Sequence, residues 1–198
     1  MKILGGQLKG RNFFMPAWIR PTQGLVRRAL FDILGHDLEG ATVLDLCAGS
    51  GAVGLEALSL GAGKVTFVEK DPRCAEIISE NIKLLGIGDN NDGERLYEII
   101  QTDIFAAIKT FARQNKRFDL VFIDPPYSRG MAKKSLKMLE AYDILHPNYT
   151  VVIQHEKKEI LPEGQGRFLA FRQKKYGATI LSIYKQTKDE IVSNHGDT

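Results

Sequence analysis

Cysteines, long apolar runs and clusters of metal ligands are scarce or missing in this sequence. The 198 residues include two cysteines, Cys47 and Cys74, and four histidines. Two distant cysteines without metal-ligand spacing indicate reduced thiols, so neither a disulfide framework nor a zinc site is expected. No apolar stretch reaches the ~18 residues of a transmembrane helix, and the N-terminus lacks the apolar core of a signal peptide. We therefore expect a cytoplasmic protein that uses no metal and no membrane.

Acidic residues are missing from two long stretches. Residues 1–30 contain six basic residues and no acid, and residues 164–188 again contain six basic residues and no acid. Because the net charge is only +3, the region between them is net acidic. Basic ends on an otherwise ordinary domain favour a polyanion partner such as nucleic acid, although solubilising charge is a common alternative.

Apolar runs and amphipathic segments alternate from residue 41 onward. The expected strands cover residues 42–46, 65–68, 97–100, 118–123 and 150–153. Helical patterns between them, one of them over residues 136–145, indicate a parallel, doubly wound sheet. The tail differs, because two strands at 167–172 and 179–184 follow each other without a helix. The predicted fold is α/β and Rossmann-like, with a mostly parallel seven-strand sheet and a C-terminal antiparallel hairpin.

The first forty residues form a piece of their own. Segments 2–4 and 9–14 flank Gly5-Gly6 and predict a small β-hairpin. A helix follows, with one apolar face from which Arg27 and Arg28 largely depart. We expect three parts in the chain: a basic N-terminal extension over residues 1–40, an α/β domain over 41–188 and a flexible tail over 189–198.

A glycine-rich turn and three strand-end acids predict a nucleoside cofactor. Residues 49–54 fit the pattern G-x-G-x-x-G, which lets the backbone approach a ligand closely. Glu69 ends the second strand, where a carboxylate suits a ribose diol. Asp103 follows the third strand and could meet an adenine amine, with Ile104 against the ring. The alternatives are a surface acid at Glu69 and an N-terminal helix cap at Asp103.

Asp45, which precedes the glycines, favours S-adenosyl-L-methionine over a dinucleotide. A carboxylate there would oppose a pyrophosphate, yet it could help to hold an amino-acid moiety, indirectly if not by contact. The predicted cofactor-binding residues are Asp45, Ala48, Gly49, Ser50, Gly51, Glu69, Lys70, Asp103 and Ile104.

The most informative motif is Asp124-Pro125-Pro126-Tyr127, directly after the strand at 118–123. Ligands of open α/β sheets bind where strands end. The prolines restrict the backbone, so the Asp124 carboxylate and the Pro125 carbonyl become fixed acceptors beside the Tyr127 ring. Two acceptors and an aromatic ring suit a planar group carrying an NH2. The motif is typical of methyltransferases acting on exocyclic or amide nitrogens, and all four residues are candidate catalytic residues; a proline-rich turn is the structural alternative.

Several further motifs resemble those of the bacterial ribosomal RNA small subunit guanine-N2 methyltransferase D family. They are Ile3-Leu4-Gly5-Gly6-Gln7-Leu8-Lys9-Gly10-Arg11, Arg20-Pro21-Thr22, Val26-Arg27-Arg28-Ala29-Leu30-Phe31, Val68-Glu69-Lys70-Asp71 and Lys175-Tyr176-Gly177, in addition to the turn and the Pro-Pro motif. The N-terminal motifs are the more specific ones. Arg28 departs from the family's usual glutamate, and Gln154-His155-Glu156 replaces a more acidic segment.

The resemblance implies methylation of the exocyclic N2 of a guanine in 16S ribosomal RNA, met in a 30S assembly intermediate. The basic extension would then hold RNA through Arg11, Arg20, Thr22 and Arg27, with Trp18 as a further candidate. We expect a monomer. A DNA adenine or cytosine amino-methyltransferase would share the chemistry, but the chain has no sizeable target-recognition region. Protein-glutamine methyltransferases favour Asn where this chain has Asp124, and a complete cofactor motif argues against a non-catalytic RNA-binding module.

Overall fold

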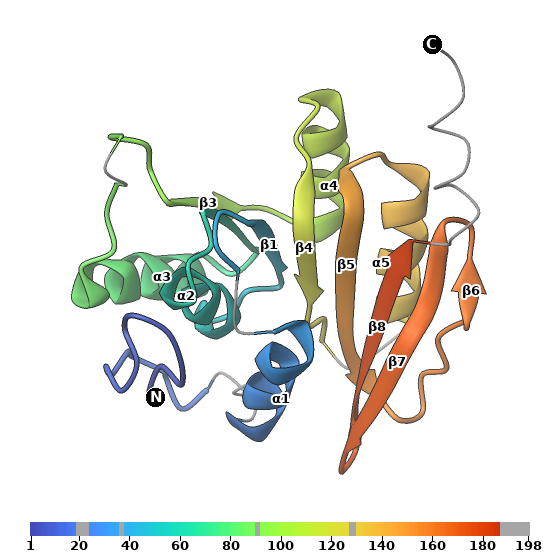
Figure 1. Cartoon of the computed structure of the whole chain (residues 1–198), viewed down its shortest axis with the longest axis horizontal. Helices are drawn as coiled ribbons and strands as arrows, with labels where there is room; N and C mark the ends of the chain where they lie inside the picture. Colours follow the sequence, from blue (N-terminus) through green and yellow to red (C-terminus); the bar gives the residue numbers. More distant parts are fainter. Residues whose placement is uncertain (19–23, 36–37, 90–91, 127–129, 187–198) are drawn as a thin grey trace. The chain divides into compact units, whose positions relative to one another are not determined.

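The apolar runs of the sequence form the strands of an α/β protein (Figure 1). The computed structural model describes residues 1–18, 24–35, 38–89, 92–126 and 130–186. Its internal contacts divide the chain into two units, Met1–Ala107 and Ile108–Thr198. The extension is thereby grouped with the first three strands, so the expected boundary at residue 40 remains a prediction. The expected tail, residues 189–198, lies outside the described residues.

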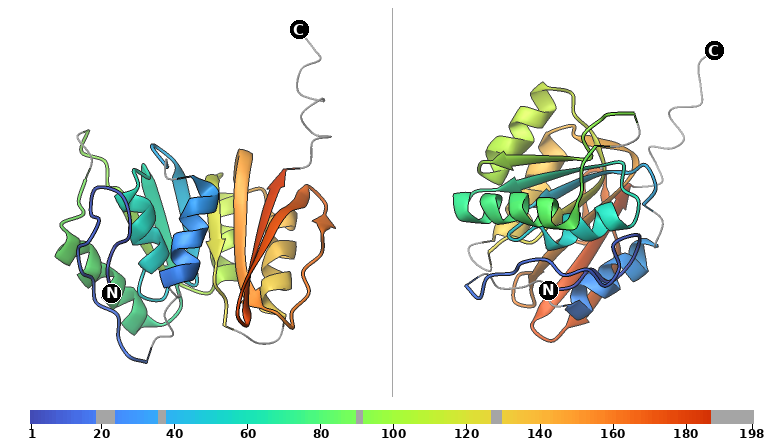
Figure 2. Two further views of the ribbon diagram at one scale, coloured as in Figure 1. Left: turned by 60° about the horizontal axis from the view of Figure 1, so that its bottom comes forward. Right: turned by 90° about the vertical axis from the view of Figure 1, so that its left-hand side faces the viewer.

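In the first unit three strands pair in parallel, with β2 in the middle. They are β1 (Thr42–Leu46), β2 (Lys64–Glu69) and β3 (Tyr97–Gln101). The helices of this unit are α1 (Gly24–Leu34), α2 (Ala52–Ser59) and α3 (Pro72–Leu85). Helix α2 packs along β1 and β2, and α3 packs along β2 and β3 (Figure 2). The expected strands are confirmed, and their carboxyl ends form one edge of the sheet.

Local signals set the limits of α3. Asp71 is the N-cap and accepts from the Arg73 amide at 2.9 Å, and Pro72 occupies the first helical position. Gly86 ends the helix in the left-handed conformation, with φ 66°. Its buried face includes Ile78, which is fully buried.

Two glycines permit close approach of neighbouring elements. A Cβ on Gly54 would lie 2.2 Å from the Phe67 ring, so α2 can pack on β2 only with glycine there. A Cβ on Gly6 would lie 1.8 Å from the Ser59 carbonyl oxygen, and φ at Gly6 is +70°. The extension therefore rests directly on the end of α2. Its expected hairpin is reduced to a single bridge, between Lys2 and Asn12.

In the second unit β4 (Phe118–Ile123) pairs in parallel with β5 (Leu145–Glu156). The antiparallel part follows from β5 through β8 (Thr179–Gln186) to β7 (Phe168–Tyr176), which confirms the C-terminal hairpin. A short strand β6 (Gly164–Gln165), which the sequence analysis missed, pairs with the start of β7. Helix α5 (Met131–Ala141) packs against β5, and α4 (Ile104–Arg113) crosses the boundary between the units.

The helix expected over residues 136–145 is displaced. Gly130, with φ 68°, lets α5 begin at Met131, and the chain becomes extended at Tyr142. Leu145 therefore starts β5, which is longer than the expected strand at 150–153. Within the described residues no helix is long and apolar enough to cross a membrane.

Candidate functional site

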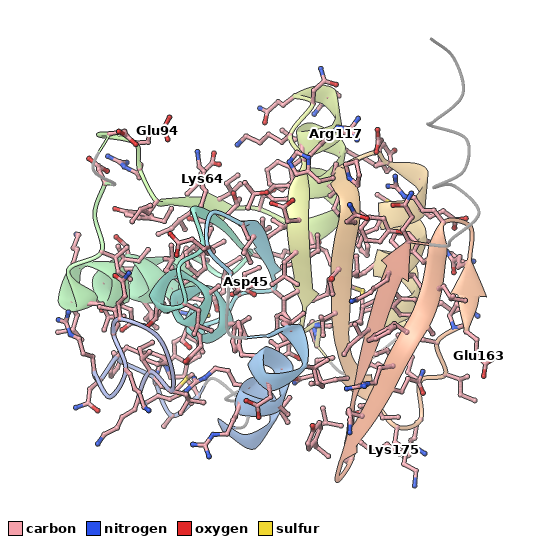
Figure 3. The ribbon with its side chains drawn as sticks, viewed as in Figure 1. Asp45, Lys64, Glu94, Arg117, Glu163 and Lys175 are labelled. Atoms are coloured by element: carbon pink, nitrogen blue, oxygen red, sulfur yellow. The ribbon has the colours of Figure 1, made fainter. Side chains whose placement is uncertain are left out.

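Asp45 lies at the end of β1 and caps helix α2 (Figure 3). The side chain is buried, with 1% of its surface exposed, and Oδ2 accepts from the Gly54 amide at 3.0 Å. The N-cap residue Gly51 has no side chain, so Asp45 supplies the acceptor that the first turn of α2 requires. The negative charge also matches the positive end of the helix dipole. Asp45 thus positions the glycine-rich turn, and its indirect role in holding an amino-acid moiety stays a prediction.

Glu69 ties the same turn to the end of β2. One carboxylate oxygen accepts from the Gly49 amide at 2.8 Å, and the other accepts from Lys70 at 2.7 Å and Asp71 at 2.9 Å. A carboxylate has about four acceptor positions, so these bonds leave capacity for a ribose hydroxyl. The predicted residue Lys70 is exposed beside it.

The turn itself, residues 47–51, is built from backbone conformations that favour glycine. Gly49 and Gly51 have φ of 57° and 81°, and Cys47 also has a positive φ, 62°. The Ala48 amide donates to the Val68 carbonyl at 3.1 Å, which fixes the turn to β2. Ser50 is buried, and Ala48 and Gly49 are half-buried. This cradle, with an acid on the adjacent strand, fits the ribose and amino-acid moiety of S-adenosyl-L-methionine.

Asn81, which the sequence analysis missed, joins the turn to the N-terminal extension. Its side chain is fully buried; Nδ2 donates to the Ser50 carbonyl at 3.1 Å and to the Phe14 carbonyl at 2.9 Å. Oδ1 accepts from the Phe14 amide at 2.7 Å. An amide in the apolar stripe of α3 was the available signal, since buried polar groups require partners.

Asp103 caps helix α4. Its carboxylate accepts from the Phe105 amide at 2.9 Å, as the capping alternative predicts. Ile104 is buried, with 4% of its surface exposed. Contact of Asp103 and Ile104 with adenine stays a prediction.

The Pro-Pro motif follows β4 directly. Asp124 is half-buried, Pro125 is buried and Pro126 is exposed, while Tyr127 lies outside the described residues. Ile123, the last residue of β4, pairs with Ile153 of β5. The Asp124 carboxylate therefore lies at the carboxyl end of a buried strand, as predicted.

Arg11 and Arg27, two of the predicted RNA-binding residues, hold the extension in place. The Arg11 guanidinium donates to the carbonyls of Leu84 and Leu85, at 3.0 and 2.6 Å, at the negative end of α3. Arg11 itself remains exposed. Arg20 and Thr22 lie outside the described residues. Trp18 is exposed, and the guanidinium of Arg73 lies 4.6 Å from its ring centre.

Arg27 is buried, although the sequence placed it largely off the apolar face of its helix. Only 1% of its surface is exposed, Nε lies 3.2 Å from Glu56, and the guanidinium donates to the Lys2 carbonyl at 2.5 Å. Burial lowers the pKa of Arg27 and raises the pKa of Glu56, while the attraction between the two charges opposes both shifts. An RNA contact of Arg27 would require opening this ion pair. Within the described residues no group of three or more acidic, His or Cys side chains could hold a metal ion.

Comparison with known proteins supports the methyltransferase interpretation. The profile of the family described as Conserved hypothetical protein 95 matches residues 1–185. The chain is 35% identical over 159 residues to the ribosomal RNA small subunit methyltransferase D of Buchnera aphidicola, covering 79% of this chain and 78% of that protein.

Solved structures agree on the fold. The Escherichia coli protein yhhF superposes with a TM-score of 0.79 at 27% identity, over 94% of this chain and 97% of that one. An RNA methyltransferase of Salinibacter ruber, solved with S-adenosyl-L-homocysteine, has a TM-score of 0.62 at 19% identity, over 85% of this chain and 95% of that one. The fold is therefore that of class I S-adenosyl-L-methionine-dependent methyltransferases, as the sequence predicted.

Proposed function

The chain belongs to the ribosomal RNA small subunit methyltransferase D family, and from that premise we propose that it methylates the N2 amine of a guanine in 16S ribosomal RNA. The observation that carries the proposal is Asp124 with Pro125 at the carboxyl end of β4, in a chain that also holds the glycine-rich turn. We propose that it acts in the cytoplasm as a monomer, on RNA in a 30S assembly intermediate.

The first unit would bind the cofactor. Glu69 accepts from the ribose hydroxyls, and the turn that Asp45 and Glu69 hold surrounds the amino-acid moiety. Asp103 and Ile104 contact the adenine. Bound S-adenosyl-L-methionine supplies a methyl group already activated on a sulfonium, so the protein need only position it and exclude water.

The second unit would orient the acceptor. The lone pair of a guanine amine is delocalised into the ring, so the amine is a weak nucleophile. Hydrogen bonds from its N–H groups to the Asp124 carboxylate and the Pro125 carbonyl favour a pyramidal nitrogen with a directed lone pair. Tyr127 stacks on the base, which must leave its helix or be unpaired already. As the N–C bond forms, the bond between the methyl carbon and the sulfonium sulfur breaks, and S-adenosyl-L-homocysteine would be the leaving group. The nitrogen gains positive charge, which Asp124 would stabilise until the proton passes to solvent.

The test follows tritium from labelled S-adenosyl-L-methionine into free 16S RNA, 30S particles, duplex DNA and protein. We expect label in guanine N2 of 16S RNA. Asp124→Ala should reduce transfer by about 100-fold or more, because positioning supplies much of the rate, while cofactor affinity stays within about threefold. The matched control is Asp92→Ala, which removes an exposed loop acid.

Three results would contradict the proposal. Label in duplex DNA alone would favour the amino-methyltransferase alternative. Label in protein alone would favour the glutamine alternative. Near wild-type turnover of Asp124→Ala would refute the assigned role of the carboxylate.

A further inference from the structure

Strand β7 has an exposed stretch that covers none of the core. Its residues 171–175 are all exposed, whereas residues 179–184 of the partner strand β8 are all buried. A strand that covers a core on one face alternates between buried and exposed positions. Beyond Ala170, whose amide donates to the Glu163 carbonyl at 2.7 Å, the described part of β7 pairs with no strand on its β6 side. This stretch therefore forms an open edge with both faces accessible.

The exposed edge is basic and aromatic. Arg172, Lys174 and Lys175 are exposed on β7, and Lys185 is exposed on β8. The Phe171 ring is 54% exposed, with the Lys185 ammonium 4.4 Å from its centre. No acid occurs between residues 164 and 188.

Other charges of this region do not belong to the surface. Arg167 donates to Asp143 at 3.1 Å and to the Leu139 carbonyl at 3.0 Å, so it holds α5 rather than facing solvent. The neighbouring segment 156–159 carries two acids and two lysines, which cancel. Exposed Glu163, whose carbonyl accepts from the Ala170 amide, adds one acid beside the four cations, so the edge remains positive.

The register of the sheet brings this edge to the level of the Pro-Pro motif, within one unit. The paired positions are Ile123 with Ile153, Ile153 with Ser182, and Ser182 with Gln173. Strands β4 and β7 run in the same direction, so Lys174 and Lys175 follow Gln173 as Asp124 follows Ile123. Figure 3 shows Lys175 near the tip of the hairpin. Three strand spacings of about 4.8 Å separate β4 from β7, roughly 14 Å in all.

We propose that Arg172, Lys174, Lys175 and Lys185, which line both faces of this open edge, bind the phosphates of single-stranded RNA a few nucleotides away from the target nucleotide, with one base stacked on Phe171. At about 3.4 Å per stacked nucleotide, 14 Å corresponds to roughly four nucleotides from the target base. Exposed aromatic rings among cations are the usual platform for unpaired bases. This inference rests on the proposed function, since it assigns a second RNA-binding surface to that enzyme.

Lysines on an open edge can also serve only to prevent strand pairing between molecules. The double charge reversal K174E/K175E separates the two roles, because it keeps the edge charged. It should weaken binding to free 16S RNA by about tenfold or more at low salt. Unchanged affinity would show that the charges protect the edge alone and would overturn the proposal.

The neutral pair K174Q/K175Q measures the number of phosphate contacts. The slope of log affinity against log salt concentration is negative, and its magnitude should decrease by about 1.4, because each phosphate contact with a single strand contributes about 0.7. The matched control is K133Q/K134Q, which neutralises two exposed lysines of α5 and should leave the slope unchanged. Thermal unfolding of each variant establishes that the fold is intact.

Phe171→Leu tests the stacked base. It should weaken binding of single-stranded RNA by roughly 5- to 100-fold, and Phe171→Tyr should restore it. Equal affinities of the Leu and Tyr variants would remove the ring from the proposal.

Two comparisons keep this inference separate from the proposed function. If the wild type transfers no methyl group to 16S RNA, the proposed function fails, whatever the hairpin variants do. If the wild type is active and K174E/K175E matches it in RNA affinity but loses activity on 30S particles alone, the surface binds a ribosomal protein and our inference fails by itself.

Discussion

The buried ion pair between Glu56 and Arg27 should be the main support of the N-terminal extension. The Glu56 carboxylate accepts from the Leu4 amide at 2.8 Å and the Gly5 amide at 2.6 Å, and lies 3.2 Å from Arg27 Nε. Side-chain exposure is 1% for Arg27 and 2% for Glu56. Replacing Glu56 with Gln keeps the shape and one acceptor but leaves a buried guanidinium without its counter-ion.

Breaking a buried pair from one side costs about 3–5 kcal/mol. Adding the separate bonds to a charged group, about 1.5–3 kcal/mol each, would overstate the loss because the three partners share one carboxylate. We therefore expect Glu56→Gln to lower the free energy of unfolding by about 3–5 kcal/mol. The midpoint of thermal unfolding should fall by roughly 6–20 °C, at about 2–4 °C per kcal/mol for a chain of this size.

Urea unfolding followed by the fluorescence of Trp18, the single tryptophan of the chain, measures this loss where it occurs. Glu76→Gln, an exposed change on α3, is the matched control and should stay within about 0.5 kcal/mol. The double variant R27M/E56Q should recover part of the loss, because it removes the uncompensated charge. A loss below about 1 kcal/mol in Glu56→Gln, or no recovery in the double variant, would refute this reasoning.

Two further predictions concern the cysteines and a buried histidine. Burial raises the pKa of the Cys74 thiol to about 11, so iodoacetamide at pH 8 should alkylate half-buried Cys47 first. Bound S-adenosyl-L-homocysteine should protect Cys47 from alkylation, as followed by mass spectrometry. No protection of Cys47 would contradict the proposed cofactor site. The His155 ring lies 2.8 Å from Ser182 Oγ, and burial lowers the pKa of His155. The neutral ring therefore contributes fully to folding stability above the unfolded-state pKa of about 6.5. This contribution is lost as the pH falls through the lower pKa of the folded state. In urea unfolding, the free energy of unfolding should therefore decrease more between pH 7 and pH 5 in the wild type than in His155→Gln. Equal decreases would exclude this role of His155.

Helices and strands whose limits are marked by local sequence signals, within a few residues, were predictable. Asp71-Pro72 and Gly86 delimit α3 through capping and backbone conformation, and the structure has the helix between them. The limits of α5 were wrong because an apolar pattern alone cannot distinguish the last turn of a helix from the first residues of a buried strand such as Leu145. The fold class needed only the alternation of these segments.

The positions of the site residues were predictable where each residue lies at the end of a strand that the sequence itself indicates. The acids Asp45, Glu69 and Asp103 lie where the alternation predicted, and Asp103 caps α4 as one of the two interpretations had it. The hydrogen-bond partners of Asp45 and Glu69 did not follow from the alternation. Asn81 was missed because its partners, Phe14 and Ser50, are 67 and 31 residues away along the chain.

The sequence by itself determined the α/β fold, the glycine-rich turn and the position of Asp124-Pro125 after a buried strand. These depend on backbone preferences and on periodicity over a few residues. The tertiary structure decided which charges remain available. It buried Arg27 against Glu56, 29 positions away, and it placed Lys174 and Lys175 on an open edge at the level of Asp124 through three strand pairings. The sequence records a charge, but packing and register determine whether that charge meets solvent, a counter-ion or a ligand.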